Sequence, residues 1–140
     1  MTLKLLALLT IVPAIVGCVR TNATVLDPNL KLVKMCPDAV RLYTTPAKVP
    51  AQYQEVALLH SSGESGWSDE EDMLESMREK AAKLGANGII LDNIDEPSAL
   101  TKVIGAVART GSERKGKALA IYVPSEFAAA NELCASRKKS

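Results

Sequence analysis

Two runs of consecutive apolar residues, one on each side of a helical segment, most limit the folds open to this 140-residue chain. The first run is Val56 to Leu59 in "YQEVALLHSS", and the second is "IILD" at 89–92. Apolar side chains at consecutive positions predict strands that are buried on both faces. A strand, a crossover helix and a second such strand predict a βαβ unit with parallel strands and a right-handed connection.

The segment between these runs carries the signals of a helix over Asp69–Leu84. Ser68 and Glu71 have the spacing of a capping box, and the acidic first turn suits the positive end of the helix dipole. Gly85 is placed to take the left-handed conformation that commonly ends a helix. The apolar stripe that we expect to face the sheet consists of Leu74, Met77, Ala81 and Leu84.

The remaining segments predict further strands and a second helix. "AVRLYTT" at 39–45 and "KALAIYV" at 117–123 alternate as strands do. Residues 101–108, "TKVIGAVA", fit either a helical stripe or a strand, and their β-branched residues favour the strand. We expect this segment to pair with 117–123 as an antiparallel hairpin around a basic loop, with a short helix to about Ala135 after it.

The N-terminus has the pattern of a targeting segment. Lys4 supplies a positive charge, residues 5–12 form a short apolar core, and Pro13 breaks the run. A transmembrane helix needs about 20 apolar residues, more than this run contains. The alternative, a buried core helix, would show polar positions along one face at helical spacing, and residues 5–18 do not.

Ile15-Val16-Gly17-Cys18 resembles the lipobox of bacterial lipoproteins. The resemblance implies that residues 1–17 are removed and that Cys18 carries a diacylglycerol thioether and an acylated amine. More than one acyl chain gives stable membrane attachment. Val19, rather than aspartate, follows the cysteine, and in such lipoproteins this implies the outer membrane, with the domain facing the periplasm.

With Cys18 assigned to lipid, Cys36 and Cys134 are left as an even pair in an oxidising compartment. We predict that they form a disulfide joining the two ends of the domain; the alternative is two buried thiols. Closing a loop of about 100 residues would contribute about 4 to 5 kcal/mol in the chain-entropy model.

These signals divide the chain into a signal peptide at 1–17, a lipid anchor and tether at 18–35, an α+β domain at 36–136 and a basic tail at 137–140. The expected fold class is α+β: a βαβ core with a mixed sheet, one long helix packed on it, a C-terminal β-hairpin and a short C-terminal helix.

A possible ligand edge consists of His60, Ser61 and Asp92, because the carboxyl ends of parallel strands meet at one edge of a sheet. A Ser/His/Asp relay or a His/Asp metal site could form there. A single histidine at a strand end is more often structural, however, and zinc sites need three or four ligands. We therefore expect no catalytic residues, no metal and no cofactor.

Two surface features are candidate contacts. Trp67, beside the acidic helix start, is either a partner contact or a cover over the core. The basic loop with Arg109, Arg114, Lys115 and Lys117 either meets anionic headgroups or is a solvated loop. Nucleic acid is not an expected partner, because 17 basic residues face 16 acidic ones and Trp and Phe number only two.

"EKAAKLGANGIILD", residues 79–92, resembles the helix-to-strand signature of two groups of small bacterial domains. These are the envelope-stress sensor lipoproteins of the Rcs phosphorelay and the YbjQ-type domains labelled as heavy-metal binders. The chain departs from the Rcs sensor in having one cysteine pair rather than two disulfides and in lacking its long Pro-rich, basic linker. The resemblance therefore implies the fold more than a role in stress sensing.

The expected function is a lipid-anchored periplasmic interaction or sensor module of the cell envelope, without enzymatic activity. Its expected contacts are the membrane, through the Cys18 lipid, and an envelope protein. The alternative is an envelope domain that binds a small ligand or a metal at His60 and Asp92, and a cell-envelope hydrolase ranks third.

Overall fold

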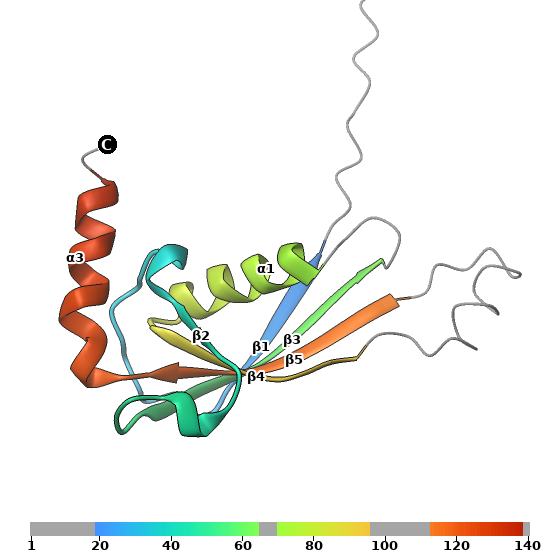
Figure 1. The fold of residues 1–140 in the computed structure, drawn as a ribbon, viewed down its shortest axis with the longest axis horizontal. Coiled ribbons are helices and arrows are strands. Elements are labelled where there is room, and N and C mark those ends of the chain that lie inside the picture. The colour runs from blue at the N-terminus through green and yellow to red at the C-terminus, as the bar shows by residue number, and fades with distance from the viewer. Residues whose placement is uncertain (1–18, 65–69, 96–112, 139–140) are drawn as a thin grey trace, which may run out of the picture.

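The chain forms one mixed sheet with helices at its face and its end (Figure 1). The computed structural model describes residues 19–64, 70–95 and 113–138. The strands are β1 (Arg20–Val25), β2 (Arg41–Tyr43), β3 (Gln54–Glu64), β4 (Gly88–Asp95) and β5 (Glu113–Tyr122). The helices are α1 (Glu70–Lys83) and α3 (Phe127–Arg137), with 3-10 turns η1 (Pro37–Ala39), η2 (Pro46–Lys48) and η3 (Pro124–Glu126).

The five strands lie in the order β1-β3-β5-β4-β2. β5 pairs antiparallel with both β3 and β4, β1 pairs antiparallel with β3, and β2 pairs parallel with β4. The predicted α+β class with a mixed sheet is therefore confirmed. β3 and β4 run in the same direction, but β5 lies between them, so these two strands are not the neighbours that a simple βαβ unit would make them.

The strand that pairs with 117–123 differs from the one expected for the C-terminal hairpin. Both edges of β5 are occupied, one by β3 and the other by β4. Residues 101–108, the expected partner, lie outside the described residues. Arg114, Lys115 and Lys117 belong to β5 rather than to a loop, because pairing with two neighbours satisfies the backbone of a polar segment that has little strand propensity of its own.

Residues 20–35, expected to be part of a tether, fold onto the domain instead. β1 pairs with β3 from Arg20↔Ser62 to Val25↔Ala57. Beyond it, the Leu26 amide donates to the Val56 carbonyl at 3.0 Å and the Met35 amide to the Ala82 carbonyl at 2.9 Å. The folded domain therefore begins about sixteen residues before the predicted boundary at 36.

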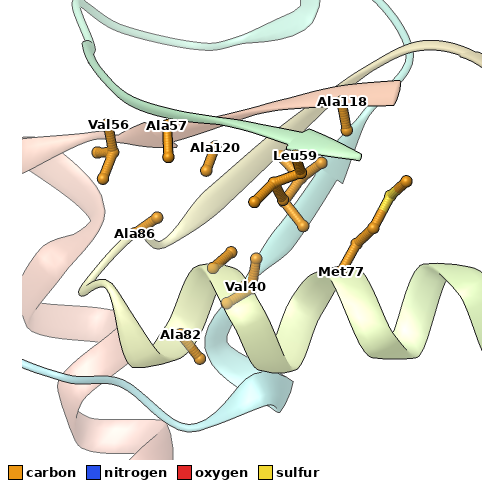
Figure 2. Packing of buried hydrophobic residues seen from close by; sticks show 11 residues of the cluster. Val40, Val56, Ala57, Leu59, Met77, Ala82, Ala86, Ala118 and Ala120 are labelled. Carbon is orange, nitrogen blue, oxygen red and sulfur yellow. The ribbon is translucent and has the colours of Figure 1, made fainter. Parts of the chain in front are cut away.

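The main core lies between α1 and one face of the sheet (Figure 2). Met77 of α1 and Leu59 of β3 are fully buried in this core, and alanines on β3 and β5 make up much of the sheet surface that faces the helix. These small side chains allow close packing of the helix backbone. The buried helix positions are Met73, Met77, Ala81 and Ala82, so the buried stripe is shifted from the prediction, and Leu74 and Leu84 are only half-buried.

Gly85 ends α1 as predicted, with a φ of +84°. A Cβ atom at this position would clash with the Cβ of Leu32 and lie 2.8 Å from the Val33 carbonyl oxygen. Glycine is thus required both for the backbone conformation and for the close approach of the 26–35 segment. Among the described residues, none of the helices has the length and apolar character needed to cross a membrane.

The predicted disulfide between Cys36 and Cys134 is confirmed. It joins η1 to α3, the helix that stands at the end of the sheet (Figure 1). Arg137, expected in a basic tail, lies in the last turn of α3 and forms an ion pair with Asp38 at 3.2 Å. A covalent bond and an ion pair thus connect the same two elements.

Candidate functional site

The sheet face opposite α1 carries a groove that the described residues leave open. One part of this face is covered, because Val49 and Tyr53 pack against Ile90 and Ile121. The rest is hollowed into a groove of about 490 Å³. Its lining includes Pro46, Leu58, His60, Ile90, Lys117 and Leu119. The groove is thus mostly apolar, with two polar side chains, a composition typical of small-ligand sites.

Strand alternation brings Leu58 and His60 to the open face. Successive side chains of a strand point to opposite faces of the sheet. Leu59 and Ser61 are buried, whereas Leu58 is 43% exposed and His60 is exposed. The expectation that this strand is buried on both faces is therefore wrong at Leu58.

His60 is the middle member of a polar row that crosses three strands. It pairs with Asn22 on β1 and with Lys117 on β5. Directly opposite residues of neighbouring strands have Cβ atoms about 5 Å apart, so His60 lies beside Asn22 on one side and beside Lys117 on the other. We call Asn22, His60 and Lys117 the polar row.

Ser61 does not share a site with His60. Ser61 is only 2% exposed and accepts a hydrogen bond from the Thr21 hydroxyl at 3.1 Å; Thr21 in turn lies 2.7 Å from the Ser76 hydroxyl of α1. This hydroxyl cluster connects β1, β3 and α1 on the face away from the groove. The structure therefore does not bring together the serine and histidine of the imagined relay.

Asp92 lies in β4, on the far side of β5 from His60. The β4–β5 register shifts between Leu91 and Asn93, and Lys117 pairs with both Asn93 and His60. The β3 and β4 backbones are thus two strand spacings apart, about 9.5 Å. The side chain of Asp92 lies outside the described residues, as do Cys18, Trp67 and Arg109 entirely.

Neither a metal centre nor a free thiol pair is found in residues 19–64, 70–95 and 113–138. Within these ranges there is no group of three or more His, Cys, Asp or Glu side chains that could hold a metal ion. Cys36 and Cys134 form a disulfide and therefore have no free thiol.

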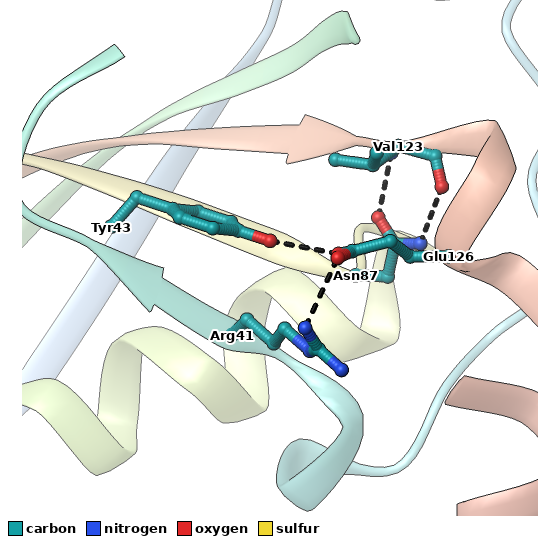
Figure 3. Close-up of polar contacts among 5 residues, drawn as sticks. All are labelled: Arg41, Tyr43, Asn87, Val123 and Glu126. Atoms are coloured by element: carbon teal, nitrogen blue, oxygen red, sulfur yellow. Dashed lines mark hydrogen bonds and ion pairs between the residues drawn. The ribbon is translucent and has the colours of Figure 1, made fainter. Parts of the chain in front are cut away.

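A polar cluster at the other end of the sheet is structural (Figure 3). Glu126 accepts hydrogen bonds from the Tyr43 hydroxyl at 2.7 Å and from the Arg41 guanidinium at 3.1 Å. Burial, followed by the bond to Glu126 and its charge, raises the pKa of Tyr43 to about 12. Tyr43 is therefore a hydrogen-bond donor at neutral pH and not a base.

Asn87 is a second structural polar residue (Figure 3). It is 1% exposed; its amide nitrogen donates to the Val123 carbonyl at 2.9 Å, and its side-chain oxygen accepts from the Val123 amide at 2.7 Å. Both polar atoms are satisfied by backbone, as a neighbouring strand would satisfy them. Asn87 thus extends the β4–β5 pairing past the last strand residue.

Sequence reasoning missed Leu58 and Lys117 as groove residues. Lys117 begins the strand predicted at 117–123 but is also counted in the basic loop, and Leu58 lies in a run of four apolar residues that hides the alternation. Only the pairing of β3 with β5 places Lys117 opposite His60. The spacing of two residues between Leu58 and His60, with apolar Leu59 between them, was the available signal.

No protein-family model matches this sequence, and neither does any curated protein. Among solved structures, the chain is similar to the crystal structure of a Francisella virulence factor, FvfA, with 18% sequence identity and a TM-score of 0.48. The match covers 73% of this chain and 96% of that one.

Proposed function

We propose that this protein is a non-enzymatic interaction or sensor module of the bacterial cell envelope, held at the periplasmic side of the outer membrane by lipid on Cys18. The Cys36–Cys134 disulfide supports export, because such bonds persist in oxidising compartments. The observation that carries the proposal is the start of β1 at Arg20, two residues after the lipobox cysteine.

This short connection defines how the module would act. Two extended residues span about 7 Å, so lipid on Cys18 would hold the nearby end of the sheet beside the headgroups. Ser62 and Lys115 lie at that same end, in register with Arg20. The proposed partner is therefore an envelope protein that reaches the membrane surface. A partner farther from the membrane would require a longer tether between Cys18 and the domain.

The anchor is tested by metabolic labelling with a palmitate analogue and by mass measurement of the mature N-terminus. We expect label on the fragment that contains Cys18 and no trace of residues 1–17. Cys18→Ser should lose the label, whereas Cys134→Ser, a change at a disulfide cysteine, should keep it. An unlabelled chain that retains residues 1–17 would refute the anchor.

The short reach is tested by inserting a flexible linker of about 15 residues between Val19 and Arg20. A photoreactive residue at exposed Arg20, at the end of the sheet next to Cys18, should capture an envelope protein in native membranes. The linker should lower this capture while leaving the label on Cys18 unchanged. Equal capture with and without the linker would contradict a partner bound at the membrane surface.

A second candidate function, binding of a small ligand, is favoured by the open groove. Ligand sites usually have volumes of about 300 to 1,000 Å³ and are lined mainly by apolar side chains with a few polar groups. We expect a photoreactive neutral alkyl probe to label β3 and β5, and Leu58→Asp to lower this labelling about tenfold. Leu133→Asp is the matched control, since Leu133 of α3 is 42% exposed and Leu58 is 43% exposed. Equal labelling of the two variants would remove the groove as a ligand site.

A further inference from the structure

The groove beside the polar row has an apolar floor and a donor-rich rim. Leu58 and Leu119 contribute apolar surface from two neighbouring strands, buried Ile90 lies next to them on β4, and Pro46 also lines the groove. An apolar chain laid along this floor would remove part of the exposed surface of Leu58 from water, which favours binding. The floor thus fits a narrow apolar group.

The rim carries positive charge and several hydrogen-bond donors. Lys117 is exposed, and no acidic side chain of the described residues forms an ion pair with it. Its ammonium has three donors and no acceptor, and His60, the residue opposite it on β3, can donate beside it. A group that only accepts hydrogen bonds and carries negative charge complements this rim.

We propose that the groove binds a long-chain carboxylate, a free fatty acid, with its alkyl chain over Leu58 and Leu119 and its carboxylate at Lys117 and His60. This inference rests on the ligand-binding function proposed for the groove and names the chemical class of the ligand. A volume of about 490 Å³ between strands and Pro46 suits a single chain, which favours a free acid over a two-chain phospholipid.

The test compares two photoreactive probes of equal chain length, a fatty acid and the corresponding fatty alcohol, on the full chain in its native membranes. Labelled fragments are identified by mass spectrometry. We expect the acid to label β3 and β5, and unlabelled fatty acid to compete about two- to fivefold better than unlabelled alcohol, as an exposed ion pair predicts.

Variants separate the two parts of the site. Lys117→Gln should lower labelling by the acid about two- to fivefold and leave labelling by the alcohol unchanged. Lys34→Gln, a change at an exposed lysine outside the groove lining, is the matched control. Leu58→Asp should lower labelling by both probes about tenfold, and Leu133→Asp should not.

The outcomes distinguish this inference from the function on which it rests. Equal labelling by acid and alcohol, unchanged in Lys117→Gln, would refute the proposal that the ligand is a carboxylate and would leave the proposed ligand binding intact. Failure of both probes to label β3 and β5 would refute the fatty-acid ligand and also the ligand-binding function of the groove. A photoreactive residue at position 58 that captures a protein or a second copy of this chain, and no fatty acid, would also overturn the proposal.

Discussion

Glu126 shows how a single carboxylate can fix the end of a sheet. It lies in η3, directly after β5, and takes donors from two residues of β2, a strand that pairs with β4 and not with β5. The Glu126 side chain is 15% exposed, whereas the Arg41 side chain is 62% exposed. An ion pair with one exposed member contributes little by itself, so the bond from buried Tyr43 is the larger stabilising contact.

The first prediction concerns Tyr43→Phe. Loss of a hydrogen bond to a charged acceptor should lower the free energy of unfolding by about 1.5 to 3 kcal/mol at pH 7. The pKa of Tyr43 is raised from 10.0 to about 12 in the folded protein. An unfolded tyrosine therefore loses its proton first, so the contribution of Tyr43 is fully present below pH 10 and is lost as pH rises towards 12.

Urea unfolding of both proteins between pH 8 and about 12 measures this difference. The gap in free energy between wild type and Tyr43→Phe should narrow above pH 10. Tyr122→Phe is the control, because the Tyr122 ring packs edge-on against Phe127 and is not a donor to Glu126 in the described contacts. A gap that stays constant with pH would show that Tyr43 does not hold its proton in this way.

Elements whose signals are local were predictable, and those that depend on pairing were not. The α1 segment has a capping pattern, an apolar stripe and Gly85 at its end, so its bounds could be predicted within about one residue. β1 has no such signal. It is an edge strand in which only Thr21 and Ala23 are half-buried, and both are small.

The second prediction follows from β1 as an element of the sheet. Hydrogen exchange measured on the full chain should be slowed at the alternate amides of residues 20–26 that donate to β3, among them Leu26, whose amide donates to the Val56 carbonyl. The backbone amide of Lys34, an exposed residue, donates to no backbone carbonyl in a turn or cap of the described residues and should exchange faster. If residues 20–26 instead exchange at the rate of a free peptide, they are part of a tether, as the sequence predicts, and not a strand.

For the whole molecule, the order of strands was the least predictable property. The apolar runs of β3 and β4 identify two central strands. Neither run indicates that β5, which follows both in the sequence, lies between them in the sheet. The same long-range pairing creates the candidate site, since it sets Lys117 opposite His60. Predicting the site from sequence therefore required a strand register that only the folded sheet determines.

The Cys36–Cys134 disulfide acts at this largest scale, because it links residues 98 positions apart and encloses the whole sheet except β1. Its removal should leave the native pairing of the strands unchanged and lower the free energy of unfolding by about 2 to 5 kcal/mol, mainly by releasing the unfolded chain. We expect Cys36→Ser/Cys134→Ser to unfold at lower urea with a steeper dependence, since an unlinked chain exposes more surface. The reduced wild type should unfold at the same urea concentration as this variant, and Cys18→Ser at the same concentration as the oxidised wild type. An unchanged midpoint after reduction would contradict the prediction, because the core and the Arg137–Asp38 ion pair alone would then fix α3 to η1.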